Sequence, residues 1–179
     1  MEMTLDRVVV TVEEIDRMVE RVATELRQTL AGVERPLFVG VMEGSYIWMA
    51  DLLRRLASDF DIESDYIDVS SYDGESSTGQ IKIVQDLHTQ LAGRTVVILD
   101  EVIDTGLTLQ NLKANFLERG AERVYIAVAT DKRVTMTEAE VDPDFVGIRV
   151  PNEFLVGYGM DYNEHYRNLP MISVLKITE

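Results

Sequence analysis

An apolar run that ends in two acids and a turn of small residues most constrains what this chain can fold into. The run covers Thr95 to Leu99, Asp100 and Glu101 follow it, and Asp104 to Thr108 form the turn. Apolar side chains then recur at helical spacing over residues 109–116. A continuous run of this kind is typical of a strand buried on both faces of a parallel sheet. The pattern therefore predicts a strand, a tight turn and a helix in succession.

The same succession occurs earlier in the chain. Leu37 to Met42 is a short apolar run, Glu43 to Ser45 have the composition of a turn, and apolar residues from Tyr46 to Leu56 recur at helical spacing. Two strand, turn and helix units therefore precede the carboxyl-terminal third of the chain.

A capping box and several shorter segments complete the predicted elements. Thr11 and Glu14 have capping-box spacing, which predicts a helix that ends near Gly32. Ser71 to Gly79 lack periodicity and are rich in turn residues, so they predict a loop that is long enough to be a lid. Further strands are predicted at Tyr66 to Ser70, Ile81 to Val84, Arg123 to Ala129, Phe145 to Val150, Leu155 to Tyr158 and Ile172 to Lys176.

Strands that alternate with helices indicate an α/β fold with a mostly parallel sheet flanked by helices. No internal repeat or linker interrupts residues 1–179, so we expect a single domain. In open sheets of this class, ligands bind beyond the carboxyl ends of the strands. The two predicted turns should therefore face one crevice.

Charge and cysteine content exclude several kinds of site. The chain has a formal net charge of −15 and no cysteine. An excess of acids argues against a nucleic-acid surface, which needs clustered Lys and Arg. Without thiolates, a bound metal would depend on oxygen ligands, which suits Mg²⁺. His88 and His165 are the chain's only imidazoles, and neither lies in a pattern that calls for a functional role.

No apolar run approaches the roughly 18 residues that a membrane-spanning helix needs, and Met1 to Asp6 lack the features of a signal peptide. We therefore expect a cytoplasmic protein that does not enter membranes. Many acids with few lysines also suit a salt-rich cytoplasm, where screening relieves self-repulsion. A melting temperature that falls as KCl is raised to molar levels would contradict this halophilic hypothesis.

The Asp104 to Thr108 turn has the composition of a phosphate cradle. It offers backbone N–H groups, two hydroxyls and the amino end of a helix, all of which favour an anion. A phosphate cradle beside the carboxylates of Asp100 and Glu101 suits a ligand that also carries hydroxyls or a cation. A phosphorylated sugar bound with Mg²⁺ has both.

These residues resemble the phosphoribosyl-pyrophosphate signature of the type I phosphoribosyltransferases, and of their hypoxanthine-guanine branch. The likeness extends from about residue 36 to residue 175. The segment VGYGMDYNEHYRNLP, which begins at Val156, is specific to enzymes that use 6-oxopurines. Other matching segments, in the family's order, are Val39 to Ser45, Ser70 to Tyr72 and Asp131 to Arg133.

The resemblance implies transfer of the phosphoribosyl group from phosphoribosyl pyrophosphate to hypoxanthine or guanine. It also implies a small hood formed by terminal segments and assembly as a homodimer or homotetramer. At the base end, Asp104 would exchange a proton with purine N7, and Lys132 would donate to purine O6. Phe154 would stack on the purine, and the backbone carbonyl of Leu155 would accept from the amine of guanine.

Each of these residues also has a simpler interpretation. Asp104 could merely cap the helix that follows. Lys132 could be a solvated lysine at a strand end, and Phe154 could be core packing. The family resemblance favours the functional interpretation in each case.

At the phosphate end, the resemblance implies a second set of roles. Asp161 would meet Mg²⁺, and Arg167 would hold the departing pyrophosphate together with the Glu43-Gly44 turn, where a cis peptide is expected between Met42 and Glu43. A lid that carries Ser71 and Tyr72 would exclude water. The residues expected to bind phosphoribosyl pyrophosphate are Asp100, Glu101, Asp104, Thr105, Gly106, Leu107 and Thr108.

The chain departs from the family pattern at two places. Many relatives carry Lys where this chain has Glu43, and the acidic pair is usually Glu then Asp, whereas here it is Asp100 then Glu101. A carboxylate at residue 43 cannot pair with pyrophosphate, so either only the backbone matters at that turn or Arg167 and Mg²⁺ carry more of the charge. The reversed acidic pair would place the carboxylate that reaches the ribose one methylene further out, which predicts weaker substrate binding.

Two other functions are compatible with parts of the pattern. Asp104-Thr105-Gly106 also occurs in aspartic proteases, but these need a second copy or a symmetric dimer of mostly β structure. A non-catalytic relative that senses nucleotides or binds RNA is the main alternative. The acidic composition argues against RNA, and Lys132, Phe154 and Asp161 would then have no role.

Overall fold

A computed structural model describes residues 2–71, 81–133 and 141–178 of the chain, and its main sheet has six strands. Their order is β4-β3-β2-β5-β6-β7, and every neighbouring pair is parallel except β3 and β4. The predicted α/β fold with a mostly parallel sheet is confirmed. The strands are β2 (Leu37–Met42), β3 (Glu63–Ser71), β4 (Ile81–Gln85), β5 (Thr95–Ile103), β6 (Arg123–Asp131) and β7 (Phe145–Arg149).

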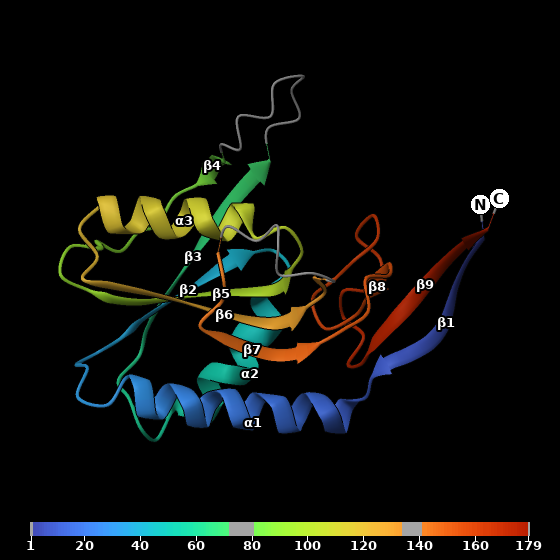
Figure 1. Cartoon of the computed structure of the whole chain (residues 1–179), viewed down its shortest axis with the longest axis horizontal. Coiled ribbons are helices and arrows are strands. Elements are labelled where there is room, and N and C mark those ends of the chain that lie inside the picture. Colours follow the sequence, from blue (N-terminus) through green and yellow to red (C-terminus); the bar gives the residue numbers. More distant parts are fainter. Residues whose placement is uncertain (1, 72–80, 134–140, 179) are drawn as a thin grey trace.

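Helices cover both faces of this sheet. α1 (Val12–Thr29) and α2 (Tyr46–Leu56) lie on one face, and α3 (Leu107–Glu118) lies on the other (Figure 1). Alternate residues of β5 divide between the two faces. Val97 and Leu99 belong to the apolar cluster of α1 and α2, whereas Val96 and Ile98 belong to the cluster of α3. This double burial explains why β5 is apolar at every position rather than at every second one.

The predicted capping box begins α1. The backbone N–H of Glu14 donates to Thr11 Oγ1 at 3.3 Å, and the backbone N–H of Thr11 donates to Glu14 Oε2 at 2.8 Å. The two bonds satisfy donors that the first turn of a helix leaves unpaired. The helix ends at Thr29, close to the predicted end.

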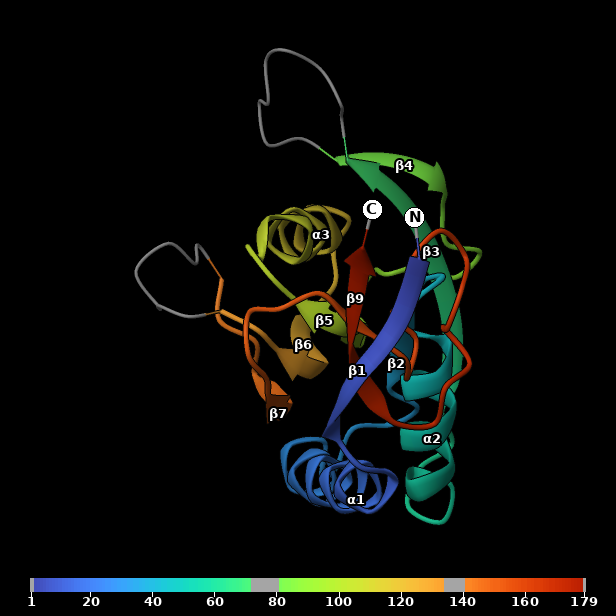
Figure 2. The ribbon, with the colours of Figure 1, turned by 90° about the vertical axis from the view of Figure 1, so that its right-hand side faces the viewer.

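A second, antiparallel sheet joins the two ends of the chain and forms the hood. It consists of β1 (Glu2–Val10), β9 (Ile172–Thr178) and β8 (Leu155–Val156), in the order β1-β9-β8. Figure 2 shows this sheet crossing in front of the end of the main sheet. The hood that the resemblance implied is therefore present.

Two details of the hood differ from the sequence prediction. The prediction had no strand over residues 2–10, because β1 depends on pairing with β9 at the other end of the chain. The predicted strand from Leu155 to Tyr158 was too long, because β8 ends at Val156. Gly157 and Tyr158 have positive φ angles of 96° and 50°, which take the backbone out of the extended region.

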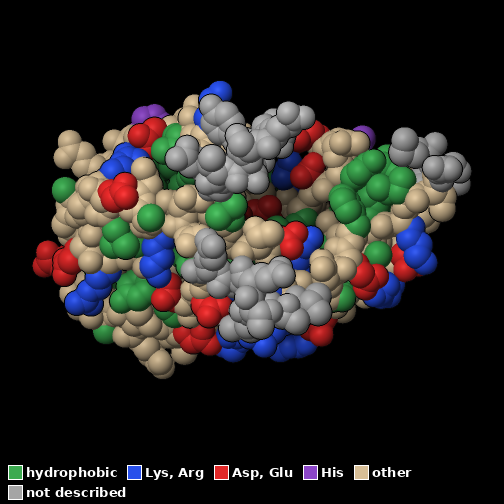
Figure 3. Space-filling model, turned by 45° about the horizontal axis from the view of Figure 1, so that its top comes forward, with side chains coloured by type: hydrophobic (Ala, Val, Ile, Leu, Met, Phe, Trp, Pro, Cys, Tyr) green, Lys and Arg blue, Asp and Glu red, His purple; other side chains and the backbone are tan. Residues whose placement is uncertain are grey.

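The surface mixes charges of both signs. On the face shown in Figure 3, Lys and Arg lie among Asp and Glu rather than in a separate basic patch, and acidic side chains line a hollow near its centre. No helix in the described part of the chain is long and apolar enough to cross a membrane.

Candidate active site

The predicted phosphate cradle lies at the carboxyl end of β5, where Asp104 to Gly106 lead into α3. Gly106 has a φ of 82°, a left-handed conformation that glycine adopts without a steric penalty. This turn borders a hollow of about 140 Å³, and five of the residues predicted to bind phosphoribosyl pyrophosphate line it. They are Asp100, Asp104, Thr105, Gly106 and Thr108, and Val102, Ile103 and Leu109 complete the lining. Glu101 and Leu107 do not line it.

The two acids at the end of β5 contact different parts of the site. Asp100 continues the α3 side of the strand and lines the cradle hollow. Glu101 continues the α2 side and lies against Gly44, where a Cβ atom would come within 2.0 Å of its carboxylate carbon. The structure therefore places one acid at the cradle and the other at the predicted pyrophosphate turn.

Burial raises the pKa of both carboxyl groups. For Asp100 the pKa lies well above its ordinary value, first because of burial and then because of the nearby charge of Glu101. Burial also raises the pKa of Glu101, although a hydrogen bond with Asp100 opposes it. Carboxylates with raised pKa values at a strand end are typical of sites that bind ligands or do chemistry.

Lys132 and Asp104 meet at the rim of the cradle. Lys132 follows β6, and its Nζ lies 3.1 Å from Asp104 Oδ2. The backbone N–H of Lys132 also donates to the carbonyl of Ile103 at 3.2 Å, which ties the two strand ends together. The structure thus brings together the predicted proton-transfer residue, which follows β5, and the predicted purine O6 donor, which follows β6.

The turn after β2 is the predicted pyrophosphate site. The peptide between Met42 and Glu43 is cis, as expected. Ser45 is fully buried, and its hydroxyl has no hydrogen-bond partner among the described residues. Gly159 closes over the turn, because a Cβ atom there would lie 2.0 Å from the carbonyl oxygen of Gly44. Neither this backbone approach nor a role for Gly159 was predicted from the sequence, although a glycine between two ordered segments is a usable signal.

Arg167 lies at the centre of a group of acids beside this turn. Its Nη2 is 3.1 Å from Glu164 Oε2, 3.3 Å from Asp161 Oδ1 and 3.8 Å from Glu43 Oε2. Its Nη1 donates to the carbonyl of Gly159 at 2.9 Å. The predicted pyrophosphate arginine and the predicted metal ligand are therefore neighbours.

The predicted stacking residue is accessible. The side chain of Phe154 is 49% exposed, and its ring packs edge-on against Tyr162, with 5.5 Å between centroids. It is therefore not a core residue, which was its simpler interpretation. Leu155 is buried and begins β8. Ser71 is the last residue of β3 and pairs with Ile81 of β4, whereas Tyr72 lies outside the described residues.

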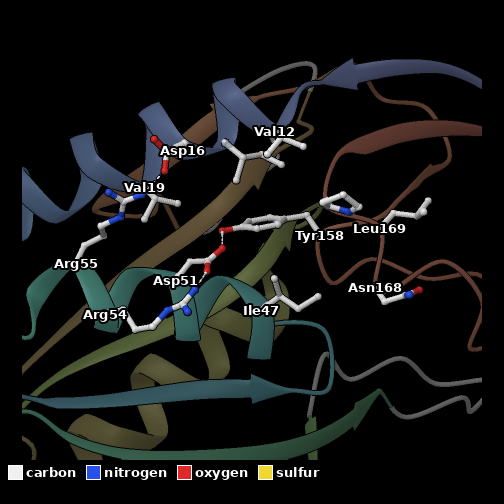
Figure 4. A pocket seen from close by; sticks show the side chains of 12 residues that line it. Val12, Asp16, Val19, Ile47, Asp51, Arg54, Arg55, Tyr158, Asn168 and Leu169 are labelled. Carbon is white, nitrogen blue, oxygen red and sulfur yellow. Dashed lines mark hydrogen bonds and ion pairs between the residues drawn. The ribbon is translucent and has the colours of Figure 1, made fainter.

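A larger hollow of about 580 Å³ lies between α1, α2 and residues 168–170, and contains none of the predicted site residues (Figure 4). The hydroxyl of Tyr158 donates to Asp51 Oδ2 across it at 3.0 Å. Asp51 also pairs with Arg54 at 2.6 Å, and Asp16 pairs with Arg55. The charged side chains that line this hollow are thus paired with one another. The hydrogen bond from Tyr158 also connects the predicted purine segment to α2.

Comparisons with known proteins agree with the geometry. Residues 11–163 match the family model described as Phosphoribosyl transferase domain. The hypoxanthine-guanine phosphoribosyltransferase of Bacillus subtilis (strain 168) is 41% identical over 173 residues, which cover 96% of this chain and 94% of that protein. The corresponding protein of Streptococcus pneumoniae (strain R6) is 41% identical over 177 residues, which cover 98% and 96%. A crystal structure of a hypoxanthine phosphoribosyltransferase from Staphylococcus aureus has a TM-score of 0.88 and 35% identity, and covers 96% of this chain and 92% of that one.

Proposed function

This chain belongs to the phosphoribosyltransferase family, and from that premise we propose that it transfers the 5-phosphoribosyl group of phosphoribosyl pyrophosphate to N9 of hypoxanthine or guanine. The products are IMP or GMP and pyrophosphate, which makes the reaction a step of purine salvage. Relatives that bear the name hypoxanthine-guanine phosphoribosyltransferase, and that match nearly the whole chain, support this substrate class. The protein is proposed to act as a single domain and as a homodimer or homotetramer.

The observation that carries the proposal is the 3.1 Å contact between Lys132 Nζ and Asp104 Oδ2 at the rim of the cradle. When the base bonds through N9 to the sugar, N7 must lose its proton, and the Asp104 carboxylate is the acceptor at this rim. Lys132 has only donors, so it favours the oxo group of hypoxanthine or guanine over the amino group of adenine. A base that is held by these two residues would lie at the rim of the proposed phosphate cradle.

The pyrophosphate end of the substrate is proposed to lie between the Glu43-Gly44 turn and Arg167. A guanidinium can bind phosphate oxygens through two parallel hydrogen bonds. The charge of Arg167 is balanced by Asp161, Glu164 and Glu43, whose carboxylate oxygens lie 3.1–3.8 Å from its Nη2. Pyrophosphate would compete with these carboxylates for the same donors.

The residues present fit a Mg²⁺ ion that is held mainly by its substrate. No group of three or more acidic or imidazole side chains in the described ranges could hold a metal by itself. Asp161 provides one carboxylate beside the proposed pyrophosphate site, and Mg²⁺ in such sites takes one or two carboxylates and completes its shell with phosphates and water. The ion would neutralise charge on the leaving pyrophosphate.

Phe154 and Leu155 are proposed to bind the flat base. An aromatic side chain that is half exposed beside a crevice offers a stacking surface, and stacking on a nucleobase is favourable for any base. The carbonyl of Leu155 would select guanine through its amine. Ser71 and Tyr72 are proposed to belong to a lid over the reaction centre.

A non-catalytic nucleotide sensor with the same fold is the second candidate function, and an aspartic protease is excluded by the α/β fold. Incubation with phosphoribosyl pyrophosphate, Mg²⁺ and each of hypoxanthine, guanine, xanthine and adenine separates the possibilities. We expect nucleotide from the oxopurines and little from adenine. If no base gives a nucleotide, the chain is not the proposed enzyme.

The proton transfer has its own test. Asp104→Asn should lower turnover and leave the affinity for phosphoribosyl pyrophosphate largely intact, because the cradle depends mainly on backbone donors. Thr105→Val is a control that removes a cradle hydroxyl and keeps the carboxylate. Normal turnover in Asp104→Asn would show that another group takes the proton.

A further inference from the structure

Asp131 and Arg133 flank Lys132 and form a buried pair, here called the arginine brace. Nε and Nη2 of Arg133 donate to the two carboxylate oxygens of Asp131, each at 2.9 Å. The backbone N–H of Arg133 also donates to Asp131 Oδ1, at 3.1 Å. The side chain of Arg133 is only 6% exposed, and that of Asp131 is only 3% exposed. Three hydrogen bonds therefore fix the chain on both sides of Lys132.

The brace restricts the direction in which the Lys132 side chain can point. With Asp131 and Arg133 turned inward, the side chain between them points away from the brace and reaches Asp104. The backbone on either side is fixed as well, because the N–H of Val150 donates to the carbonyl of Asp131 at 2.9 Å and the N–H of Lys132 donates to Ile103. A lysine has four rotatable side-chain bonds, so only a fixed backbone restricts the positions that its Nζ can occupy.

The brace also contacts the segment that packs on the cradle. Nη1 of Arg133 donates to the carbonyl of Val141 and to Asp142 Oδ1, each at 3.2 Å. Val141 lies against Gly106, where an added Cβ atom would be 3.2 Å from Val141 Cγ1. One buried guanidinium therefore holds the backbone beside Lys132 and the segment that packs against Gly106 of the cradle.

Stability alone does not explain a buried charged pair at this position. Removing two charges from water costs desolvation, and a packed apolar pair of similar volume often stabilises a fold equally well. An apolar pair, however, would not fix direction through hydrogen bonds. The brace has the properties expected of a device that sets geometry.

From these contacts we infer that Arg133 is a positioning residue: paired with Asp131, it holds Lys132 at Asp104 and thereby sets the preference for a base with an oxygen at C6. This inference rests on the proposed function for its substrate, but the fixed position of Lys132 is a property of the free protein. The two parts can therefore be tested separately.

The position of Lys132 is tested without any substrate. The chain has four lysines, Lys82, Lys113, Lys132 and Lys176, so brief acetylation followed by mass spectrometry can compare them within one sample. In Arg133→Met, acetylation of Lys132 relative to Lys113 should rise by about threefold, because a lysine released from an ion pair is more reactive. The control Arg119→Met breaks a different Arg–Asp pair, with Asp86 at 2.8 Å, and should leave the ratio unchanged.

The consequence for base choice is tested with hypoxanthine and unsubstituted purine, which lacks O6. The ratio of their kcat/KM values should fall by about tenfold in Arg133→Met. Loss of folded protein alone would not change this ratio, because both bases are assayed on the same folded fraction. In Arg119→Met the ratio should stay at its wild-type value.

A double variant separates positioning from stability. Asp131→Asn with Arg133→Met removes both charges and keeps an amide oxygen for the backbone N–H of residue 133. It should recover resistance to urea relative to Arg133→Met, but its base ratio should stay low. Recovery of both properties, or unchanged acetylation of Lys132 in Arg133→Met, would overturn the inference. If the wild-type protein makes no nucleotide, the proposed function fails, and the acetylation result still decides whether the brace positions Lys132.

Discussion

Replacing Gly159 with alanine tests whether the purine segment holds the pyrophosphate turn in place. A Cβ atom at this position would lie 2.0 Å from the carbonyl oxygen of Gly44 and 3.1 Å from its carbonyl carbon. A carbon and a carbonyl oxygen normally stay about 3.3 Å apart. The Gly44 turn or the Gly159 segment must therefore shift by roughly 1.3 Å, the difference between these two separations.

The stability cost has two parts, and a matched control separates them. Gly159 has a φ of 103°, so an alanine there is strained by about 1–2 kcal/mol even before the overlap is considered. Gly32, which follows α1, has a φ of 81° and no atom within 4 Å of an added Cβ. Gly32→Ala should therefore show only the backbone strain, whereas Gly159→Ala should show the strain and the displacement together.

The displacement should appear in catalysis. A misplacement of about 1 Å in a group that binds the substrate can lower the rate by on the order of 100-fold, or about 2.7 kcal/mol in the barrier. We expect kcat/KM for phosphoribosyl pyrophosphate to fall by about this factor in Gly159→Ala and by less than about twofold in Gly32→Ala.

The assays are steady-state kinetics with saturating hypoxanthine and equilibrium unfolding in urea, both on purified variants. Circular dichroism confirms that Gly159→Ala is folded under the assay conditions. If its kcat/KM stays within about threefold of the Gly32→Ala value, the contact between Gly159 and Gly44 does not constrain the pyrophosphate turn.

Three further substitutions test the electrostatics. Burial pushes the pKa of Asp65 up, but the backbone N–H groups of residues 66, 88 and 89 outweigh it and hold the pKa below its usual value. Asp65→Asn should therefore lose about 1–3 kcal/mol of unfolding free energy at pH 7. Urea titrations should show this loss shrinking as the pH falls through the folded pKa of Asp65, which lies below the ordinary value for an aspartate. Because burial raises the pKa of Asp100, Asp100→Asn should raise the Tm at pH 7 and lower product formation, and the gain in Tm should shrink toward about pH 4, where the unfolded carboxyl is also protonated. Glu43→Lys should lower KM for phosphoribosyl pyrophosphate by about threefold at low salt. Glu118→Lys makes the same charge change on α3 and should leave KM unchanged. Equal effects in the two variants would assign the change in KM to net charge alone.

Local patterns in the sequence were sufficient to predict most elements of the main sheet. The apolar run of β5 required burial on both faces, and the capping box of α1 identified its first turn, because both signals depend on neighbouring residues only. Turn composition pointed to the phosphate cradle and the family resemblance to Lys132, and the structure places Lys132 at the rim of the cradle.

One contact at the site joins the ends of two separate strands, β5 and β2. The approach of Glu101 to the Gly44 turn was not predicted, although both residues were expected at the site. Asp100 lines the cradle, and Glu101 lies against Gly44. The expected role of both acids in binding phosphoribosyl pyrophosphate stays a prediction.

Other features depend on contacts between distant segments. β1 is a strand only because β9, from the opposite end of the chain, pairs with it. The approach of Gly159 to Gly44 and the link from Arg133 to Val141 join segments whose local sequences contain no sign of each other. The sequence by itself determined most of the strands and helices, apart from β1, and which turn could bind phosphate, because periodicity and turn chemistry act over a few residues. Only the tertiary structure decided which side chains share a site, because the sheet order brings together residues that the chain keeps far apart.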